Sequence, residues 1–349
     1  MKVAHFGNFC PGRAGIHTAV MDLMAVERAV GIESNFVDWG FDPKNEFSRV
    51  GIKDEEVTTV APEWAIKEAD LLIRHSAVPP EVEKTGKPIV MYLHGRPEYN
   101  FNLDLFGKMG CLREVLHHAD SPQYKGFATF WAQHLFYWRA MLPGANLHLL
   151  PTPLNFEKYN KPEKVMDFGD ASGTPNILIC DMWREDVTPM RSVIASIEFA
   201  QKYCPTAKIH VIALPDPNAN PVVDRMFGNL RKSGFLGKLA TLIPDLKAAM
   251  WACDILVSPL NIETRTILEA QACQLPVVAS TGCLGATYSA DSSDIGATAL
   301  AINDCWKEVQ KNVGLRKRVQ RKIRERLAPD QIGRQVFNFY KEIVNGNHV

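Results

Sequence analysis

Residues suited to anion binding lie in the segment 258–280, where an apolar run gives way to a predicted helix. The polar side chains at this junction are Asn261, Glu263, Thr264, Arg265 and Thr266. Backbone N–H groups at a helix N-terminus, with hydroxyls beside them, form a cradle for an anion. Glu269 follows on the first turns of the same helix, where its carboxylate can accept hydrogen bonds from a ribose diol. A carboxylate on the helix surface is the alternative interpretation of Glu269.

Two further groups of residues suited to ligand binding follow apolar runs in the first half of the chain. Gly12 and Gly15 lie in the loop 11–15 after the first predicted strand, where glycines let backbone N–H groups approach an anion. A tight strand-to-helix turn is the alternative, because the third glycine of the dinucleotide fingerprint is missing. His94 ends the predicted strand 88–94, where a neutral imidazole can bind a sugar hydroxyl. The alternative for His94 is a ring satisfied by local backbone groups.

Two arginines follow the first predicted strand of the second half. Arg184 and Arg191 flank a loop that enters a helix. Together they can clamp a diphosphate and offset the charge that builds on a leaving group. The alternative is a surface loop in which these arginines pair with Glu185 and Asp186.

The elements that must position these residues alternate between short apolar and longer amphipathic segments. In the first half the pattern predicts strands at 3–9, 35–39, 71–75 and 88–94, and helices at 16–30, 63–69 and 105–118; the segment 127–142 fits either. In the second half it predicts strands at 176–182, 208–214, 235–239, 255–260 and 276–280, and helices at 191–203, 222–232, 246–252 and 265–273. Helical sequence continues from 297 to 344, broken near Pro329. Such alternation is typical of βαβ units and a parallel sheet.

A pair of prolines marks the predicted domain boundary. Pro151 and Pro153 precede a charged, glycine-containing stretch at 158–174, after which the alternating pattern restarts. We expect two doubly wound, Rossmann-like α/β domains at 1–150 and 151–330, and a helix at 331–349 that crosses back to the first domain. Ligands of open α/β sheets bind at the carboxyl ends of the strands. The site is therefore expected in a central cleft between the domains.

Composition limits the classes of function. The 349 residues are 46% hydrophobic and 22% charged, values of a globular protein with two domains. Lys+Arg and Asp+Glu are both 39, and this zero net charge argues against a nucleic-acid coat protein. The eight cysteines lack metal-binding spacing and are interpreted as buried free thiols of a reducing compartment. Without a signal-peptide pattern or a long apolar run, we expect no membrane span and a cytoplasmic location.

The segment 258–280 resembles the donor-binding segment of GT-B glycosyltransferases, specifically the retaining GT4-like group. The matching residues are Leu268-Glu269-Ala270, Ala272-Cys273 and Pro276-Val277-Val278-Ala279-Ser280. Other matches follow in the family's order, at 11–15, 93–95, 150–156 with Tyr159, 246–259 and 337–340. The resemblance implies the GT-B fold, with an N-terminal acceptor-side domain and a C-terminal domain that binds a nucleotide-sugar donor.

The resemblance also implies roles for residues of the donor site. Glu269 corresponds to the second Glu of the family's Glu-x7-Glu motif, which holds the donor ribose. Asn261 occupies the position of the first Glu, so either Asn261 or Glu263 takes that role. Gln274 stands where the family has Gly, which predicts a different end to the helix.

Three catalytic roles are implied by the resemblance as well. Arg184 and Arg191 correspond to the family's Arg and Lys pair on the donor phosphates, with longer spacing and Arg in place of Lys. His94 is similar to the family His near the transferred sugar. No enzymic nucleophile is assigned, because the departing phosphate and the incoming acceptor are thought to share one face in retaining members of this fold.

The implied function is transfer of a sugar from a UDP-sugar or GDP-sugar to an acceptor, with retention of configuration. This nucleotide-diphosphate sugar is a co-substrate; no tightly bound cofactor and no metal site are expected. The acceptor is a glycan, a small molecule or a modified base in DNA, and aromatic residues between 98 and 142 either shape its site or belong to the core. The basic run 316–326 can meet DNA phosphates, although such runs are usually solvated helical faces. A non-catalytic binding protein of the same fold is the further alternative.

Overall fold

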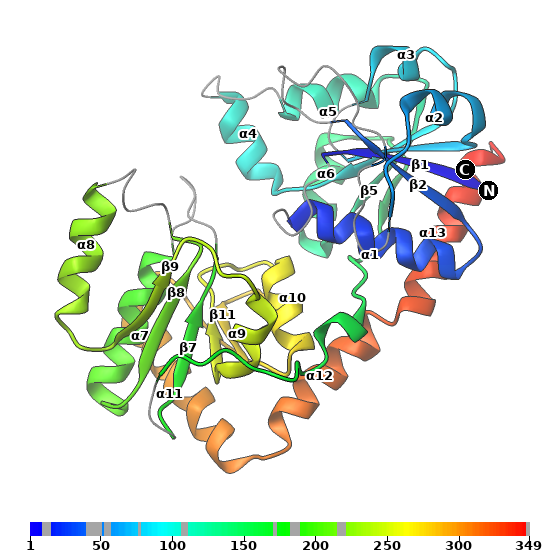
Figure 1. Cartoon of the computed structure of the whole chain (residues 1–349). Helices are drawn as coiled ribbons and strands as arrows, with labels where there is room; N and C mark the ends of the chain where they lie inside the picture. The colour runs from blue at the N-terminus through cyan, green and yellow to red at the C-terminus, as the bar shows by residue number, and fades with distance from the viewer. Residues whose placement is uncertain are drawn as a thin grey trace. The chain divides into compact units, whose positions relative to one another are not determined.

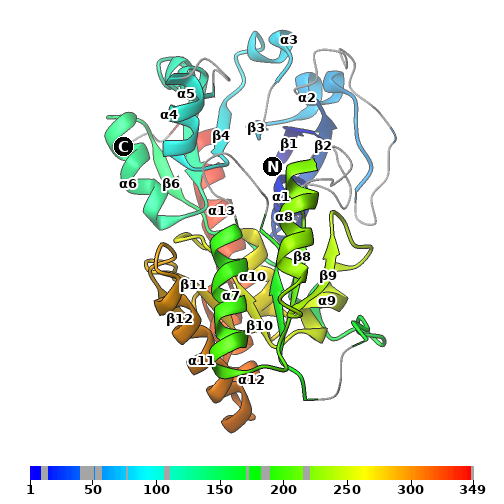
Figure 2. The same cartoon turned by 90° about the vertical axis from the view of Figure 1, so that its left-hand side faces the viewer.

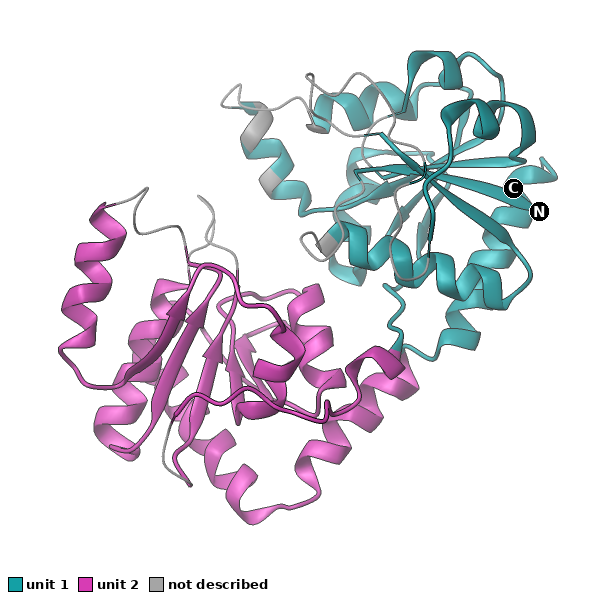
Figure 3. Ribbon diagram, viewed as in Figure 1, with its two compact units in different colours: residues 1–155, 327–349 teal, residues 156–326 magenta. Residues whose placement is uncertain are grey.

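The structure, a computed structural model, describes residues 1–8, 15–39, 51, 57–75, 78–105, 111–169, 173–181, 189–214 and 221–346. The chain divides into two compact units (Figure 3). Unit 1 comprises Met1–Asn155 and Leu327–Val349, and unit 2 comprises Phe156–Arg326. The C-terminal helix therefore belongs to the same unit as the N-terminus.

Unit 1 is built on a sheet of six parallel strands in the order β2-β1-β3-β4-β5-β6. Its strands are β1 Lys2–Gly7, β2 Glu33–Asp38, β3 Leu71–Arg74, β4 Ile89–Leu93, β5 Tyr124–Thr129 and β6 Leu147–Leu149. Its helices are α1 Gly15–Ala29, α2 Pro62–Glu68, α3 Pro80–Glu83, α4 Pro97–Leu105, α5 Cys111–Ala119, α6 Ala132–Met141 and α13 Pro329–Val344. Figures 1 and 2 trace these elements from two directions.

Helices cover both faces of this sheet because its strands are apolar on both sides. All five residues of β4, Ile-Val-Met-Tyr-Leu, are buried, as expected of a parallel strand between two helical layers. One face packs against α2, α3, α5 and α6 around the fully buried Trp138. The other face packs against α1 and α13, which also contact each other.

Unit 2 contains a second sheet of six parallel strands, in the order β12-β11-β10-β7-β8-β9. Its strands are β7 Asn176–Ile179, β8 Lys208–Ile212, β9 Leu236–Ala240, β10 Ile255–Val257, β11 Val277–Ser280 and β12 Tyr288–Ala290. Its helices are the 3-10 helix η1 Phe156–Tyr159 and α7 Met190–Tyr203, α8 Pro221–Arg231, α9 Leu246–Ala252, α10 Arg265–Ala272, α11 Ile295–Lys311 and α12 Leu315–Arg326. The helices α7 and α11 pack together on one face, and α10 packs with α9 and α12 on the other.

Most predicted strands and helices are present, with ends that differ by a few residues, but one edge strand of each sheet was missed. The edge strands β6 and β12 have three residues each, none of them buried, so they lack the apolar run that identified the equally short but fully buried β10. The helix predicted at 105–118 is instead the end of α4 at Leu105 and the helix α5 from Cys111; residues 106–110 lie outside the described residues. The ambiguous segment 127–142 contains the end of β5 and the whole of α6.

Candidate functional site

The carboxylate of Glu269 is held by two neighbours in unit 2. Arg265, one turn earlier on α10, donates Nε–H to Glu269 Oε1 at 2.8 Å. Tyr159, at the end of η1, donates its hydroxyl to the same Oε1 at 2.9 Å, and the hydroxyl accepts a bond from Arg265 at 3.1 Å. Both contacts of Glu269 fall on Oε1, so Oε2 has no hydrogen-bond partner within the described part of the chain. The carboxylate is thus fixed in position with one oxygen open.

The N-terminus of α10 lies beside this carboxylate in the sequence and carries the predicted hydroxyls. Thr264 is the N-cap residue, with extended backbone angles of φ −70° and ψ 166°, but its side chain makes no capping bond. Its Oγ1 is buried without a hydrogen-bond partner among the described residues, and Thr266 is partly exposed. Because a helix N-terminus leaves its first N–H groups without intrahelical partners, the start of α10 can receive an anionic ligand.

Asn261 and Glu263, the two candidates for the missing Glu, have different environments. Glu263 is buried and forms an ion pair with Arg326 at the end of α12. Burial raises the pKa of Glu263, and Arg326 opposes that shift. A Cβ at Gly285 would overlap Oε1 of Glu263 and lie 2.9 Å from Ile267, so both side chains pack closely against this glycine. Asn261 is exposed, which makes Asn261 the more accessible of the two for a ligand.

The end of α10 corrects the prediction made from Gln274. Gln274 adopts a left-handed conformation, with φ +61°. Its N–H bonds the carbonyl of Gln271 at 3.0 Å, and Leu275 N–H bonds the carbonyl of Ala270 at 2.9 Å. These two bonds form the Schellman motif that usually places glycine in this position. The helix therefore ends as a glycine would end it, although the residue is glutamine.

His94, in unit 1, directly follows β4 and is one of three linked histidines. Its Nε2 lies 2.8 Å from His75 Nδ1, and His75 Nε2 lies 2.9 Å from His5 Nδ1. The series continues to the buried Glu27, whose Oε2 is 2.8 Å from His5 Nε2. Burial lowers the pKa of His94 to about 3 and that of His75 well below its usual value. His75 and His94 are therefore neutral near pH 7, so the hydrogen bond between them joins two neutral rings.

The remaining predicted residues are only partly described. Arg191 is exposed on the first turn of α7, where its charge adds to the hydrogen bonds from Ser293 that lower the pKa of Asp291. Gly15 is the first residue of α1. Gly12 and Arg184 lie outside the described residues, so their predicted roles stay predictions.

The basic run 316–326 forms α12, and several of its arginines bind groups of unit 2 itself. Arg316 pairs with Asp254 at 2.6 Å, Arg318 pairs with Glu308, and Arg324 lies over the ring of Phe156. The expected solvated face is therefore correct only in part, because these side chains attach α12 to the rest of unit 2.

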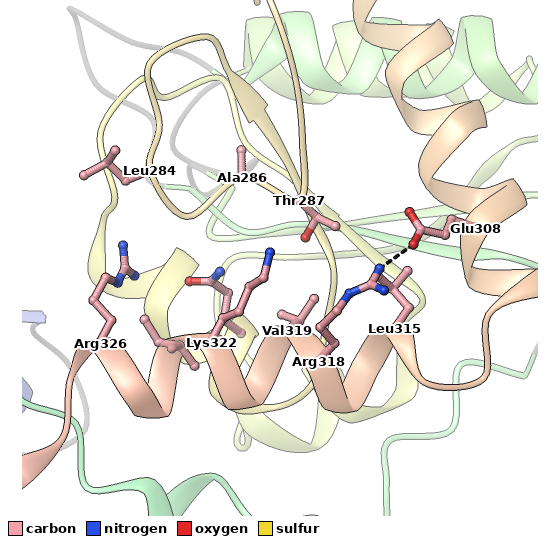
Figure 4. A pocket seen from close by; sticks show the side chains of 11 residues that line it. Leu284, Ala286, Thr287, Glu308, Leu315, Arg318, Val319, Lys322 and Arg326 are labelled. Atoms are coloured by element: carbon pink, nitrogen blue, oxygen red, sulfur yellow. Dashed lines mark hydrogen bonds and ion pairs between the residues drawn. The ribbon is translucent and has the colours of Figure 1, made fainter.

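A pocket of about 300 Å³ lies over α12, and Figure 4 shows Arg318, Lys322 and Arg326 along one of its sides. Glu308 lies opposite and bonds Arg318, while Arg326 is paired with Glu263. None of the predicted site residues lines this pocket, among those the structure describes. Its two arginines are thus already neutralised by carboxylates of the same unit.

The structure describes the side chains of six cysteines, and all six are free thiols. Five are buried and Cys204 is intermediate, which agrees with the sequence interpretation for those five. Burial raises the pKa of Cys273 to about 12 and that of Cys283 to about 11. Within the described residues, no group of three or more His, Cys, Asp and Glu side chains could hold a metal ion, and no helix is long and apolar enough to cross a bilayer.

The sequence analysis missed three members of the histidine series in unit 1: Glu27, His5 and His75. Two of them had a signal in the sequence, because His5 interrupts the apolar strand β1 and Glu27 lies in a largely apolar stretch of α1. A polar residue at a core position needs a buried partner. Which partner it finds depends on α1, β1 and β3 meeting in the fold.

Comparison with known proteins gives matches only at the level of structure. No protein-family model and no curated protein matches the chain. A glycosyltransferase from Rickettsia africae is 13% identical over 98% of both chains, with a TM-score of 0.66. HepE from Anabaena in complex with UDP is 15% identical over 98% of this chain and 100% of that one, with a TM-score of 0.68. Sucrose-phosphate synthase from Thermosynechococcus elongatus is 13% identical over 99% and 100%, with a TM-score of 0.69.

These structures match almost the whole chain at low identity, so the likeness concerns the fold. Each half of the chain has a six-stranded parallel sheet with helices on both faces. The two halves, in this order along the chain, correspond over nearly their full length to the halves of the glycosyltransferase structures. The chain therefore has the GT-B fold.

Proposed function

We propose that this protein is a glycosyltransferase that uses a nucleotide-diphosphate sugar as donor. The observation that carries the proposal is the carboxylate of Glu269, fixed through Oε1 by Arg265 and Tyr159 and open at Oε2. An ionised carboxylate with one open oxygen accepts hydrogen bonds from a ribose diol. The sequence resemblance assigns the same role to this residue, and the GT-B fold supports it. HepE, a structure with that fold, was solved in complexes with UDP and with UDP-glucose.

The donor site is proposed at the carboxyl ends of the strands of unit 2. The diphosphate meets the N-terminus of α10, where the side chain of Thr264 leaves the first N–H groups uncapped. Asn261, exposed before that helix, contributes an amide in place of the missing Glu. Arg191, exposed at the start of α7, supplies positive charge, and we assign the same role to Arg184 from the sequence.

The mechanism follows from where charge develops. When the bond between the sugar and the diphosphate breaks, negative charge grows on the leaving phosphate and the sugar becomes cationic. Fixed N–H groups and arginines stabilise that phosphate more strongly in the transition state than in the ground state. His94, neutral near pH 7, hydrogen-bonds a hydroxyl of the transferred sugar. We infer retention of configuration, with the acceptor hydroxyl attacking from the face that the phosphate leaves.

A thermal-shift panel tests the donor site. The protein is heated with saturating UDP-, GDP-, ADP- and TDP-glucose, each at about 100 times its dissociation constant, where binding adds about 2.7 kcal/mol to stability. We expect one nucleotide class to shift the melting temperature, with UDP as the first choice because HepE was solved with UDP. Glu269→Gln keeps the shape of the side chain but removes the charge, and we expect it to abolish the shift. Glu325→Gln is the matched control, since Glu325 is an exposed carboxylate on α12.

The results separate the proposal from its alternatives. A shift that survives Glu269→Gln, or no shift with any donor, contradicts the proposed donor site. A shift without release of the nucleotide diphosphate, tested with glycans and small-molecule hydroxyl acceptors, favours a non-catalytic binding protein. NMR of the product's anomeric proton then tests retention, and an inverted product contradicts that part of the proposal.

A further inference from the structure

The three histidines of unit 1 form a continuous line of hydrogen bonds that begins at Glu27 and ends at His94. Glu27 lies on α1, His5 on β1, His75 directly after β3 and His94 directly after β4. The strands β1, β3 and β4 are neighbours in the sheet (Figure 2), so the line crosses three strands. It runs from the helix layer of α1 to the carboxyl edge of the sheet. Glu27 and His5 are 0% exposed, while His94 is only partly buried.

Glu27 is the acceptor at the buried end of this line. Ser34 donates its hydroxyl to Oε2 at 2.6 Å, and Tyr340 of α13 donates to Oε1 at 2.9 Å. Tyr340 lies 2.9 Å from the hydroxyl of Tyr92, and burial raises the pKa of both tyrosines well above the usual value. Both tyrosines therefore keep their protons, and Tyr340 has one to donate. Both oxygens of Glu27 thus accept hydroxyl hydrogens, which makes this carboxyl group the acceptor at the end of the line.

The polarity of the line follows from the chemistry of imidazole. A neutral ring has one N–H donor and one acceptor nitrogen. If His5 donates Nε2–H to Glu27, its Nδ1 must accept from His75 Nε2–H. His75 Nδ1 must then accept from His94 Nε2–H. Each bond fixes the next, so His94 is left with Nδ1 as an acceptor, and within the described residues this nitrogen has no hydrogen-bond partner.

We propose that Glu27, His5 and His75 are positioning residues that hold His94 in its Nε2–H tautomer and direct the lone pair of Nδ1 toward a substrate hydroxyl. The proposal rests on the proposed function for the identity of that substrate, a sugar, but not for the tautomer. A lone pair accepts from O–H groups and repels the oxygens of phosphate or carboxylate. The line therefore selects a neutral hydroxyl at His94 and disfavours an anionic group there.

Nitrogen-15 NMR of the full chain with labelled histidine tests the tautomer without any ligand, because protonated and unprotonated ring nitrogens have distinct shifts. We expect Nε2 of His94 to be protonated and Nδ1 to be unprotonated at pH 7.5, with assignment by His94→Gln. His210 of unit 2 is an internal reference: its Nδ1 accepts the Lys238 N–H, so its Nε2 carries the proton. A His94 with protonated Nδ1 would overturn the proposal in the unaltered protein, whatever the variants do.

Removing a remote member then tests transmission along the line. His5→Phe leaves His75 without its acceptor, and we expect His94 to become a mixture of tautomers while His210 stays unchanged. With the nucleotide sugar that shifts the melting temperature as substrate, kcat/KM of His5→Phe should fall about tenfold, equivalent to about 1.4 kcal/mol. The matched control is His148→Phe, a substitution in the same unit outside the line, whose Nε2 bonds Asn146. A pure Nε2–H tautomer at His94 in folded His5→Phe would refute transmission, whereas failure of every donor would contradict only the proposed function.

Discussion

At the scale of single residues, the candidate site depends on side chains that fix other side chains. Tyr159 and Arg265 hold one oxygen of Glu269, and three further residues determine the orientation of His94. In both places the residue that would touch a ligand is the partly exposed one, and its supports are more buried. Because these side chains are already held in place, binding of a ligand has a smaller entropic cost for ordering the site.

Tyr159→Phe tests the support of Glu269. The substitution removes the hydroxyl that donates to Glu269 and accepts from Arg265, so two hydrogen bonds are lost at a half-buried site. We expect the free energy of unfolding to fall by about 1–3 kcal/mol, measured by urea denaturation, together with a smaller thermal shift from the donor. Tyr203→Phe is the control, because Tyr203 is 45% exposed on α7. Equal losses in the two variants would argue against a specific role of the Tyr159 hydroxyl.

Gln274→Gly tests the strained end of α10. A non-glycine residue in the left-handed region costs about 1–2 kcal/mol, and glycine removes that cost. Gln274 also bonds Gln320 at 3.2 Å, so we expect a net gain of about 0.5–1 kcal/mol in unfolding free energy. Gln274→Ala keeps the strain and loses the bond, and it should be less stable than the unaltered protein. Destabilisation by glycine would show that the bond to Gln320 outweighs the strain.

At the scale of elements, His210 joins β7, β8 and β9, the three strands that end at one edge of the unit 2 sheet. It lies on β8, its Nε2 is 2.9 Å from Asn176 Oδ1 on β7, and its Nδ1 accepts the backbone N–H of Lys238 on β9 at 3.1 Å. The ring stacks on Phe168 with centroids 3.8 Å apart. A Cβ at Gly237 would lie 2.6 Å from the ring, so β9 approaches this closely only because that residue is glycine.

The pH dependence of stability should report this histidine. Burial lowers the pKa of His210 to about 4, whereas an unfolded histidine has a pKa of about 6.5. Between these values the unfolded chain binds the extra proton, so stability is complete above pH 6.5 and falls as the pH falls toward 4. The slope for one such proton is at most about 1.4 kcal/mol per pH unit. His210→Gln removes this titration, so its stability deficit, measured by urea unfolding, should shrink between pH 7 and pH 5; a constant deficit would contradict the assignment.

At the scale of the whole molecule, the last helix completes the unit that the first strand begins. Tyr340 of α13 reaches Glu27 on α1, and Phe339 and Ile343 lie over Gly126 on β5. Gly333 lies against Val26 and Val30. Unit 1 therefore forms from two segments separated by the whole of unit 2, and its core requires both.

Gly126→Ala tests how closely α13 packs on the sheet. An added Cβ would lie 2.7 Å from the ring of Phe339 and 3.0 Å from Ile343, so the helix must shift or these two side chains must leave their rotamers. We expect a loss of about 1–3 kcal/mol and a lower melting temperature by calorimetry. Gly228→Ala, on α8 with nothing within 4 Å, is the matched control and should gain about 0.5–1 kcal/mol. If Gly126→Ala is as stable as its control, Phe339 and Ile343 of α13 do not pack closely against β5.

Much of the fold could be predicted from the sequence because parallel strands are buried on both faces. Runs such as 89–93 and 277–279 are apolar throughout and stand between amphipathic segments, so their number and order identify two doubly wound halves. The edge strands β6 and β12 carried no such pattern, because none of their residues is buried, whereas the equally short β10 is buried throughout. The end of α10 was also misjudged, since the bonds of the Schellman motif can hold a glutamine in a conformation that its intrinsic preference disfavours.

The sequence by itself determined the residue types at the carboxyl ends of the strands: Glu269 and its helix, His94 after its strand, and the absence of a Glu at position 261. Only the tertiary structure decided which partners these residues meet. Tyr159 reaches Glu269 across 110 positions, and His75 joins His5 across 70. Local periodicity reports which residues are buried, but hydrogen bonds between elements depend on which strands are neighbours and in which register. That pairing is a property of the whole fold, because burial of each polar group is favourable only when its distant partner is already in place.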